Sequence, residues 1–190
     1  MTTIAALNWN GSTVAGSNTG YTLAHDSVIS SGVPPWVFFQ DWALGFTGSM
    51  LALNVCRTAL SKATSSLTTE GDVATAIGKC LTEYDIGHKE TGELTWSFGI
   101  WCILVNRDGR IWDLDESLSL GPIPKRTFWA RGSGERYALG AARAIMASAP
   151  DCGCDEVVRR SIEAATFNDI YSPGDPFVVN LSAAALKQST

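Results

Sequence analysis

The chain has 190 residues, of which 45% are hydrophobic and 17% are charged, and its formal net charge is −5. This length predicts one domain spanning residues 1–190 with a sizeable buried core. The acidic balance argues against a nucleic-acid partner. No apolar stretch is long enough to cross a bilayer and no signal peptide precedes the first strand, so we expect a cytoplasmic protein without a membrane partner.

The chain opens with a predicted β-hairpin. Residues 3–9 and 12–18 flank Asn10-Gly11, a dipeptide that suits the two positive-φ positions of a type I′ turn. If Met1 is removed, Thr2 carries a hydroxyl and a free α-amine in one residue. An α-amine has a pKa of roughly 7.7 to 8, so it can accept the hydroxyl proton near neutrality. Thr2 is therefore a candidate nucleophile with its own base, although Met-Thr-Thr is also a common start for a cytosolic protein.

The next part of the chain predicts a loop, two short strands and two helices. Glycine, serine and threonine are frequent from residue 21 to residue 35, and Pro34-Pro35 closes this loop. Ser49 is the expected N-cap of the first helix, and Thr69 is that of the second, at about residues 70–84. The strands are expected at residues 36–39 and 43–47; the helical stripes are Met50, Leu53, Cys56 and Leu60, then Val73, Ile77, Leu81 and Tyr84.

The second half repeats the order of strands followed by two helices. Residues 95–105 are apolar on both faces, which predicts a strand covered on both sides and paired with residues 110–114. The remaining elements are a strand at 126–131, an alanine-rich helix at 135–149 after Gly132-Ser133-Gly134, a helix at about 155–166 and a strand at 177–181. This order predicts an α+β fold, and the doubly apolar hairpin requires sheet against sheet, as in a four-layer αββα sandwich.

The five cysteines are an odd number, which argues against a disulfide framework. We expect Cys56, Cys80 and Cys102 to be small core residues. Cys152 and Cys154 would supply half of a metal site at most, so we expect free thiols in a loop.

Other polar and aromatic groups have simpler explanations than a site. His25-Asp26 invites comparison with a catalytic triad, but a solvated loop is the better interpretation. Residues 113–116, Asp-Leu-Asp-Glu, resemble a cation cluster but are expected to be a solvated strand end. Trp96, Trp101 and Trp112 are expected in the core or in an interface.

Five short motifs follow one another in an order found in a known hydrolase family. They are Thr2-Thr3-Ile4, Ala15-Gly16, Gly45-Phe46-Thr47-Gly48, Gly132-Ser133-Gly134 before the alanine-rich helix, and Asp169-Ile170-Tyr171-Ser172-Pro173-Gly174. With them the chain resembles, over nearly its whole length, the proteasome β-subunit and bacterial HslV peptidase family of N-terminal nucleophile hydrolases. The resemblance implies a threonine-type endopeptidase subunit of a self-compartmentalising ring complex that cleaves unfolded polypeptides.

The resemblance also implies a role for each matching residue. Thr2 is the nucleophile, and the backbone amide of Gly48 stabilises the tetrahedral oxyanion. Ser133 hydrogen-bonds the terminal amine and relays its proton. Asp169 and Ser172 orient that serine and the N-terminus.

No cofactor is required for this chemistry, but the family can hold a cation on main-chain carbonyls of the last turn. The matching candidates for such a structural Na⁺ or Mg²⁺ site are Thr166, Asp169 and Ser172.

Two residues of the family pattern are missing. The family has an aspartate after the Ala-Gly pair, where this chain has Ser17, and then a lysine, where this chain has Val33. Losing both is chemically consistent because either charge alone would be unpaired. The loss of the cation predicts a rate penalty on the order of a hundred- to a thousandfold. Arg131 is a candidate substitute charge, although a strand-end arginine is more often solvated or paired at a subunit interface.

Three functions therefore stay open. The first is the peptidase, in stacked homo-oligomeric rings with Thr2 facing an inner chamber that a separate AAA+ ATPase unfoldase supplies. The second is a catalytically impaired structural ring subunit, which Ser17 and Val33 favour. The third is a hydrolase of small amides on the same fold. For the peptidase, a small or apolar pocket favours neutral substrate side chains, and its expected lining is Gly20, Val33, Pro35, Gly45 and Ser49.

Overall fold

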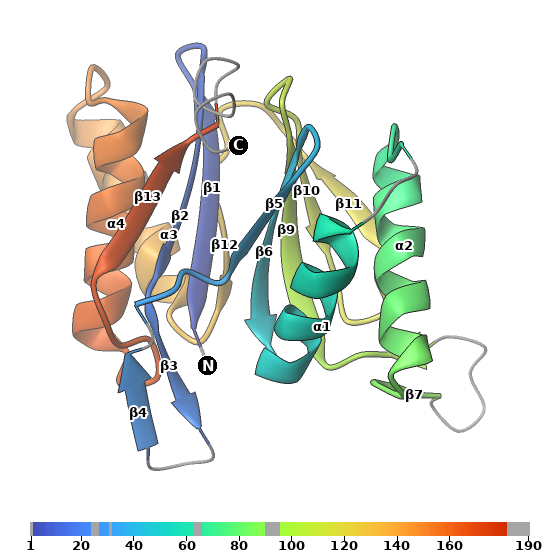
Figure 1. Ribbon diagram of the computed structural model, residues 1–190. Coiled ribbons are helices and arrows are strands. Elements are labelled where there is room, and N and C mark those ends of the chain that lie inside the picture. Colours follow the sequence, from blue (N-terminus) through green and yellow to red (C-terminus); the bar gives the residue numbers. More distant parts are fainter. Residues whose placement is uncertain (1, 24–26, 31, 63–65, 90–95, 182–190) are drawn as a thin grey trace.

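The computed structural model describes residues 2–23, 27–30, 32–62, 66–89 and 96–181. Two antiparallel sheets lie face to face, and a pair of helices covers the outer face of each (Figure 1). The first sheet contains β12 (Trp129–Gly132), β1 (Thr3–Trp9), β2 (Ser12–Asn18) and β13 (Pro176–Asn180), in that order. The second contains β11 (Leu120–Ile123), β10 (Ile111–Leu114), β9 (Ile100–Asn106), β6 (Trp42–Gly48) and β5 (Trp36–Phe39).

The helices and two small hairpins complete the chain. Helices α1 (Met50–Ser61) and α2 (Glu70–Glu83) cover the second sheet, and α3 (Glu135–Ser148) and α4 (Cys154–Asn168) cover the first (Figure 1). The hairpins are β3 (Gly20–Leu23) with β4 (Ser27–Ser30), and β7 (His88–Lys89) with β8 (Trp96–Ser97). Among the described residues, no helix combines the length and the apolar composition that a membrane crossing needs.

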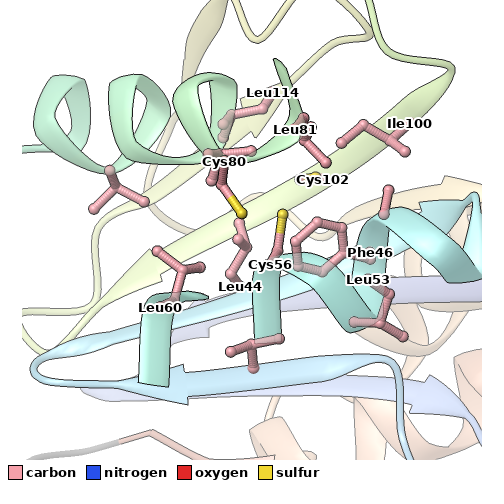
Figure 2. Packing of buried hydrophobic residues seen from close by; sticks show 14 of the residues in the cluster. Leu44, Phe46, Leu53, Cys56, Leu60, Cys80, Leu81, Ile100, Cys102 and Leu114 are labelled. Atoms are coloured by element: carbon pink, nitrogen blue, oxygen red, sulfur yellow. The ribbon is translucent and has the colours of Figure 1, made fainter. Parts of the chain in front are cut away.

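Each boundary between layers is filled by a separate apolar cluster. Between the sheets lie Ile4, Ala6, Ala15, Trp36, Ala43, Ile103, Val105, Ile111 and Leu181. Between the first sheet and its helices lie residues such as Leu7, Val14, Ala142, Val158 and Ile162. Figure 2 shows the third cluster, in which Leu44, Phe46, Ile100 and Cys102 of the second sheet meet Leu53 and Cys56 of α1 and Leu81 of α2. Three clusters between four layers confirm the predicted α+β, four-layer αββα sandwich.

The first hairpin forms as its turn residues predict. Asn10 and Gly11 both have positive φ, at 51° and 79°, as a type I′ turn requires. The resulting register pairs Ile4 with Ser17. On the outer face of this hairpin, a Cβ on Gly16 would lie 2.5 Å from Val158 Cγ1, so glycine there lets α4 pack directly on the sheet.

The predicted helix starts are also confirmed. The Ser49 side chain accepts a hydrogen bond from the Ala52 amide at 3.3 Å, and Thr69 and Asp72 form a reciprocal capping box. The predicted stripe of the second helix is wrong at its end. Tyr84 is 62% exposed because it caps the helix beyond the last turn that faces the sheet.

Several strand predictions were wrong. Residues 21–23 and 27–30, expected in a loop, form most of the β3–β4 hairpin, which begins at Gly20. The strand expected at 95–105 is interrupted by Gly99, whose φ is 61°, and Trp101 is 37% exposed, so this segment is not covered on both sides throughout. Arg126, with φ 64°, lies before the strand that was expected to start there.

The cysteine predictions hold for the core and fail at one loop position. Cys56, Cys80 and Cys102 are buried free thiols, as expected. Cys154, expected in a loop, instead begins α4, and its thiol lies 3.5 Å from the Leu7 carbonyl under the first sheet. Burial raises the pKa of this thiol to about 12.

Candidate active site

The loop after β12 lies directly against the first residues of the chain. Thr3 pairs with Gly132, which has φ 113°. A Cβ on Gly132 would collide with the Thr2 carbonyl oxygen, and one on Gly134 would lie 2.5 Å from Thr3 Oγ1. Both positions therefore need glycine, because two segments of backbone approach each other here. This approach brings the predicted Ser133 beside the N-terminus.

A buried network of hydroxyl groups joins this loop to the turn after α4. Ser172 Oγ donates to Asp169 Oδ2 at 2.8 Å and lies 2.7 Å from Thr3 Oγ1 and 3.1 Å from Ser133 Oγ. The Gly134 amide donates to Thr3 Oγ1 at 3.0 Å. Ser172 and Thr3 are both fully buried. The predicted residues Ser133, Asp169 and Ser172 are thus brought together.

The single proton on each hydroxyl fixes the direction of these bonds. The Asp169 carboxylate can only accept, so the Ser172 proton points to it. Ser172 Oγ then has only lone pairs for Thr3 and Ser133, and both must donate to it. Ser133 Oγ is left with lone pairs for any further partner, so this oxygen can accept a hydrogen bond from an amine.

Thr2 lies at the edge of this network and uses other partners. It is 6% exposed, and its hydroxyl donates to Asn18 Oδ1 at 2.5 Å. Its carbonyl accepts from Thr47 Oγ1 at 3.1 Å. The hydroxyl that reaches both Ser172 and the 132–134 loop belongs to Thr3 and not to the candidate nucleophile Thr2.

The residue beside the Thr2 hydroxyl is Asn18 and not Ser17, which corrects the sequence interpretation. Ser17 is paired with Ile4, whose side chain lies between the sheets. The Ser17 hydroxyl is buried, and among the described residues it has no hydrogen-bond partner. Thr3 and Asn18 come next in the same register and lie on the opposite face. The register set by the Asn10-Gly11 turn is the signal from which Asn18 was identifiable.

Comparison with solved structures identifies the fold. No protein-family model and no curated protein matches this sequence. BPH of Thiobacillus denitrificans is 18% identical with a TM-score of 0.77, and the match covers 95% of this chain and 99% of that one. Its complex with epoxomicin gives 19% identity, a TM-score of 0.76 and the same coverage. HslV of Trypanosoma brucei is 18% identical with a TM-score of 0.70, over 94% and 98% of the two chains. The chain has the HslV-like fold.

Within the HslV-like fold, Gly48 ends the strand that runs beside the N-terminus. Its φ is 109°, and a Cβ there would lie 2.5 Å from the Gly99 carbonyl oxygen, so glycine is required. The preceding residue, Thr47, bonds the Thr2 carbonyl. Gly48 is exposed, directly before the Ser49 cap of α1. An amide at this point, near a helix N-terminus, is suited to binding an oxyanion.

Among the described residues, no lysine or arginine replaces the missing cation beside the candidate nucleophile Thr2. Val33 is 53% exposed. Arg131 is engaged elsewhere, because its Nε donates to Asp113 Oδ1 at 2.7 Å and a second nitrogen bonds the other oxygen of that carboxylate. In the part of the chain that the structure describes, no lysine or arginine forms a hydrogen bond or ion pair with Thr2 or Asn18.

The Arg131–Asp113 pair instead connects the two sheets of the HslV-like fold. Asp113 lies on β10 and also accepts from Trp129 Nε1 at 3.0 Å, while Glu135 is 3.7 Å from the guanidinium. Hydrogen bonding to Asp113 raises the pKa of Arg131, and burial raises the pKa of Glu135. The expectation that residues 113–116 are a solvated strand end is therefore wrong for Asp113, whose side chain is 14% exposed.

Of the residues expected to hold a cation, Thr166 lies in α4, and Asp169 and Ser172 lie in the turn after it. The Asp169 carbonyl accepts from the Ser172 amide at 3.0 Å, and the Thr166 hydroxyl is buried without a hydrogen-bond partner in the described parts of the chain. No group of three or more His, Cys, Asp or Glu side chains gathers among the described residues.

Two further features are the His25-Asp26 pair and a cavity. His25 and Asp26 fall outside the described residues. A cavity of about 290 Å³ is lined by residues that include Asn8, Trp112 and Lys125. Asn8 is near the opposite end of β1 from Thr2, so this cavity is not part of the site.

Proposed function

We propose that this chain is a threonine-type peptidase subunit in which Thr2, freed of Met1, attacks the peptide bond. The observation that supports this proposal is the meeting of three segments next to Thr2, at Thr3, residues 132–134 and residues 169–172, through hydrogen bonds that are buried except at Ser133. Structures with the same fold include BPH in complex with epoxomicin. Epoxomicin is an epoxyketone, a class of compound that reacts with an N-terminal threonine.

The proposed reaction needs only groups of this chain. Thr2 Oγ attacks the carbonyl carbon while its proton passes to the α-amine, and the Gly48 amide donates to the oxyanion. The amine then protonates the leaving nitrogen, the C–N bond breaks, and an ester to Thr2 remains. Water attacks the ester, its proton goes to the amine, and Thr2 Oγ regains a proton as the acid leaves. Ser133, which has only lone pairs to offer, accepts a hydrogen bond from the amine and so orients it.

The assembly and the environment are part of the same proposal. We expect stacked homo-oligomeric rings in the cytoplasm, with unfolded polypeptide as the substrate and an AAA+ ATPase as a partner that unfolds it. The HslV-like neighbours support ring formation. No cofactor takes part in the chemistry, and a structural Na⁺ or Mg²⁺ would be held by the carbonyls of Thr166, Asp169 and Ser172.

A catalytically impaired ring subunit is the second candidate. The observation that favours it is the neutral Asn18 beside Thr2, without a cation bonded to either residue in the described parts of the chain.

Intact mass of the native protein before and after incubation with epoxomicin separates the two candidates. Loss of Met1 followed by one adduct per chain, absent in Thr2→Ala, supports the peptidase. Full-length protein without an adduct supports the impaired subunit. Turnover of an unfolded polypeptide, measured with the same preparation, then tests the peptidase directly.

A further inference from the structure

The carboxamide of Asn18 is held by four hydrogen bonds. Its oxygen accepts from the Thr2 hydroxyl at 2.5 Å and from the Thr3 amide at 2.7 Å. Its nitrogen donates to the carbonyls of Gly20 and Pro173, both at 2.6 Å. Each end meets only groups of the complementary kind, so the orientation of the amide is determined. The Thr2 hydroxyl therefore has a rigid support.

The surroundings of Asn18 select a neutral group. A carboxylate in the same place would put an oxygen 2.6 Å from two carbonyl oxygens that cannot donate. Asn18 is fully buried, and its described partners are uncharged. A charge there would be desolvated and unpaired, which is costly.

The charged groups around Asn18 do not alter this conclusion. The segment after α4 packs against Asn18 and contains two carboxylates. Asp169 accepts a hydrogen bond from Ser172, and Asp175 is exposed. On β1, the nearest titratable group is the α-amine that Thr2 carries once Met1 is removed. Two carboxylates would disfavour a third negative charge, and only the amine would favour it.

We propose that Asn18 is the positioning residue for the Thr2 hydroxyl, and that this site works with a neutral amide in place of a charged pair. The inference rests on the proposed function. An amide oxygen is too weak a base to take the hydroxyl proton, but it fixes the position of Thr2 Oγ. The proton can turn about the Cβ–Oγ bond toward the amine without moving the oxygen, so the α-amine is the base.

Two substitutions at this position test the proposal, and one at Asn8 serves as the matched control. Asn18→Ala removes the support, and Asn18→Asp keeps the shape but replaces the two N–H donors with a charged oxygen. Asn8 also donates from Nδ2, to Thr13 Oγ1 and the Gly109 carbonyl at 2.8 Å, but near the opposite end of β1. Asn8→Asp is therefore a similar perturbation away from Thr2. The measurement is the rate of epoxomicin adduct formation by intact mass, from pH 5 to pH 8.

We expect Asn18→Ala to react about 100-fold more slowly than the wild type, because the nucleophile loses its position. In Asn18→Asp, burial and the two carbonyls raise the pKa of the new carboxyl group. The rate of adduct formation by Asn18→Asp, divided by the wild-type rate, should be lowest at pH 8. This rate ratio should rise about tenfold toward pH 5, because the carboxyl group gains a proton and can donate a hydrogen bond again. Asn8→Asp should keep a constant ratio.

The thermal midpoint of Asn18→Asp provides a readout that does not need catalysis. A carboxyl whose pKa is raised by folding binds a proton more tightly in the native state, so stability falls as pH rises through that range. We therefore expect the thermal midpoint of Asn18→Asp to be well below that of the wild type at pH 8 and closer to it at pH 5. If the wild type forms no adduct, the proposed function fails, and this shift alone decides whether the site demands a neutral group.

Three results would overturn the proposal. One is a rate ratio for Asn18→Asp that rises with pH, since that requires a cation at the site. Another is Asn18→Ala reacting as fast as the wild type. The third is Asn18→Asp remaining unfolded at pH 5 as well as at pH 8, because the protonated side chain is nearly the same shape as asparagine.

Discussion

Replacing Ser172 with alanine tests the buried hydroxyl network, because this one oxygen contacts three partners. Ser172 Oγ lies 2.8 Å from Asp169 Oδ2, 2.7 Å from Thr3 Oγ1 and 3.1 Å from Ser133 Oγ. The residue is fully buried. Ser172→Ala keeps Cβ and removes only the hydroxyl group, so the loss of hydrogen bonds dominates any effect of packing.

The expected cost follows from the character of each lost bond. A hydrogen bond to a charged group contributes about 1.5–3 kcal/mol, and one between neutral groups about 1 kcal/mol. The bond to Asp169 belongs to the first kind. Thr3 is fully buried, so its proton cannot turn to water, whereas Ser133 is only half-buried. We therefore expect Ser172→Ala to lower the free energy of unfolding by about 3–4 kcal/mol.

Ser161 is a matched control because it is an equally buried serine with a single hydrogen bond. Its hydroxyl donates to the Val157 carbonyl at 2.7 Å within α4, and that carbonyl keeps its helical partner when the hydroxyl is removed. Ser161→Ala should cost about 1 kcal/mol or less, since alanine also favours the helix. Urea unfolding followed by circular dichroism at pH 7 measures both variants. Equal losses for the two serines would refute the network.

Three other perturbations have defined outcomes. In Gly132→Ala, the residue has a φ of 113° and its new Cβ would collide with the Thr2 carbonyl oxygen. This variant should lower the free energy of unfolding by at least about 2 kcal/mol and abolish adduct formation. Its control, Gly140→Ala, is at an open helical position and should raise the free energy of unfolding by about 0.5–1 kcal/mol in the same urea assay. Asp113→Ala should cost about 2–3 kcal/mol by urea unfolding, less than a fully buried pair because its arginine partner is partly solvated. In native protein at pH 8, iodoacetamide should label Cys152 and spare Cys154, because the raised pKa of the Cys154 thiol lowers its thiolate fraction about a thousandfold. Mass spectrometry of peptides measures the labelling. Equal labelling of the two cysteines would show that the Cys154 thiol is not buried.

Elements with local signals were predictable, because their stabilising contacts lie close in sequence. The Asn10-Gly11 turn and the Ser49 and Thr69 caps each involve residues within a few positions of one another. The β3–β4 hairpin was not predictable in this way. Gly20, at its start, bonds the Pro173 carbonyl at 2.9 Å, so part of its support comes from the other end of the chain.

Strand β11 was missed for a different reason. It contains Pro122, and proline inside an apolar run argues against a central strand because it cannot donate to the ladder. In the structure β11 is the edge strand of the second sheet, where one side of the strand needs no partner. A sequence pattern does not distinguish an edge strand from a loop in such a case.

At the candidate site, the residues in glycine-flanked or turn motifs were predictable from the resemblance, and those within strands were not. Ser133, Asp169 and Ser172 lie in a loop and a turn, where a motif specifies the backbone path as well as the residue. Thr3 lies in β1, where the contacts of its side chain depend on the face of the sheet from which that side chain projects. The motif Thr2-Thr3-Ile4 by itself does not tell which hydroxyl joins the network.

Strand geometry explains why Asn18, and not Ser17, lies beside the Thr2 hydroxyl. Successive side chains of a strand point to opposite faces. An error of one position in the sequence alignment therefore assigns to the site a side chain that in fact lies between the two sheets. The two-residue turn at Asn10-Gly11 pairs Ile4 with Ser17, and the same register places Thr3 opposite Asn18. Because the side chain of Ile4 lies between the sheets, that of Ser17 must lie there too. The hydrogen bonds of Asn18 to residues 2 and 3 are the direct consequence, and the side chain bonded to the Thr2 hydroxyl is therefore a neutral amide.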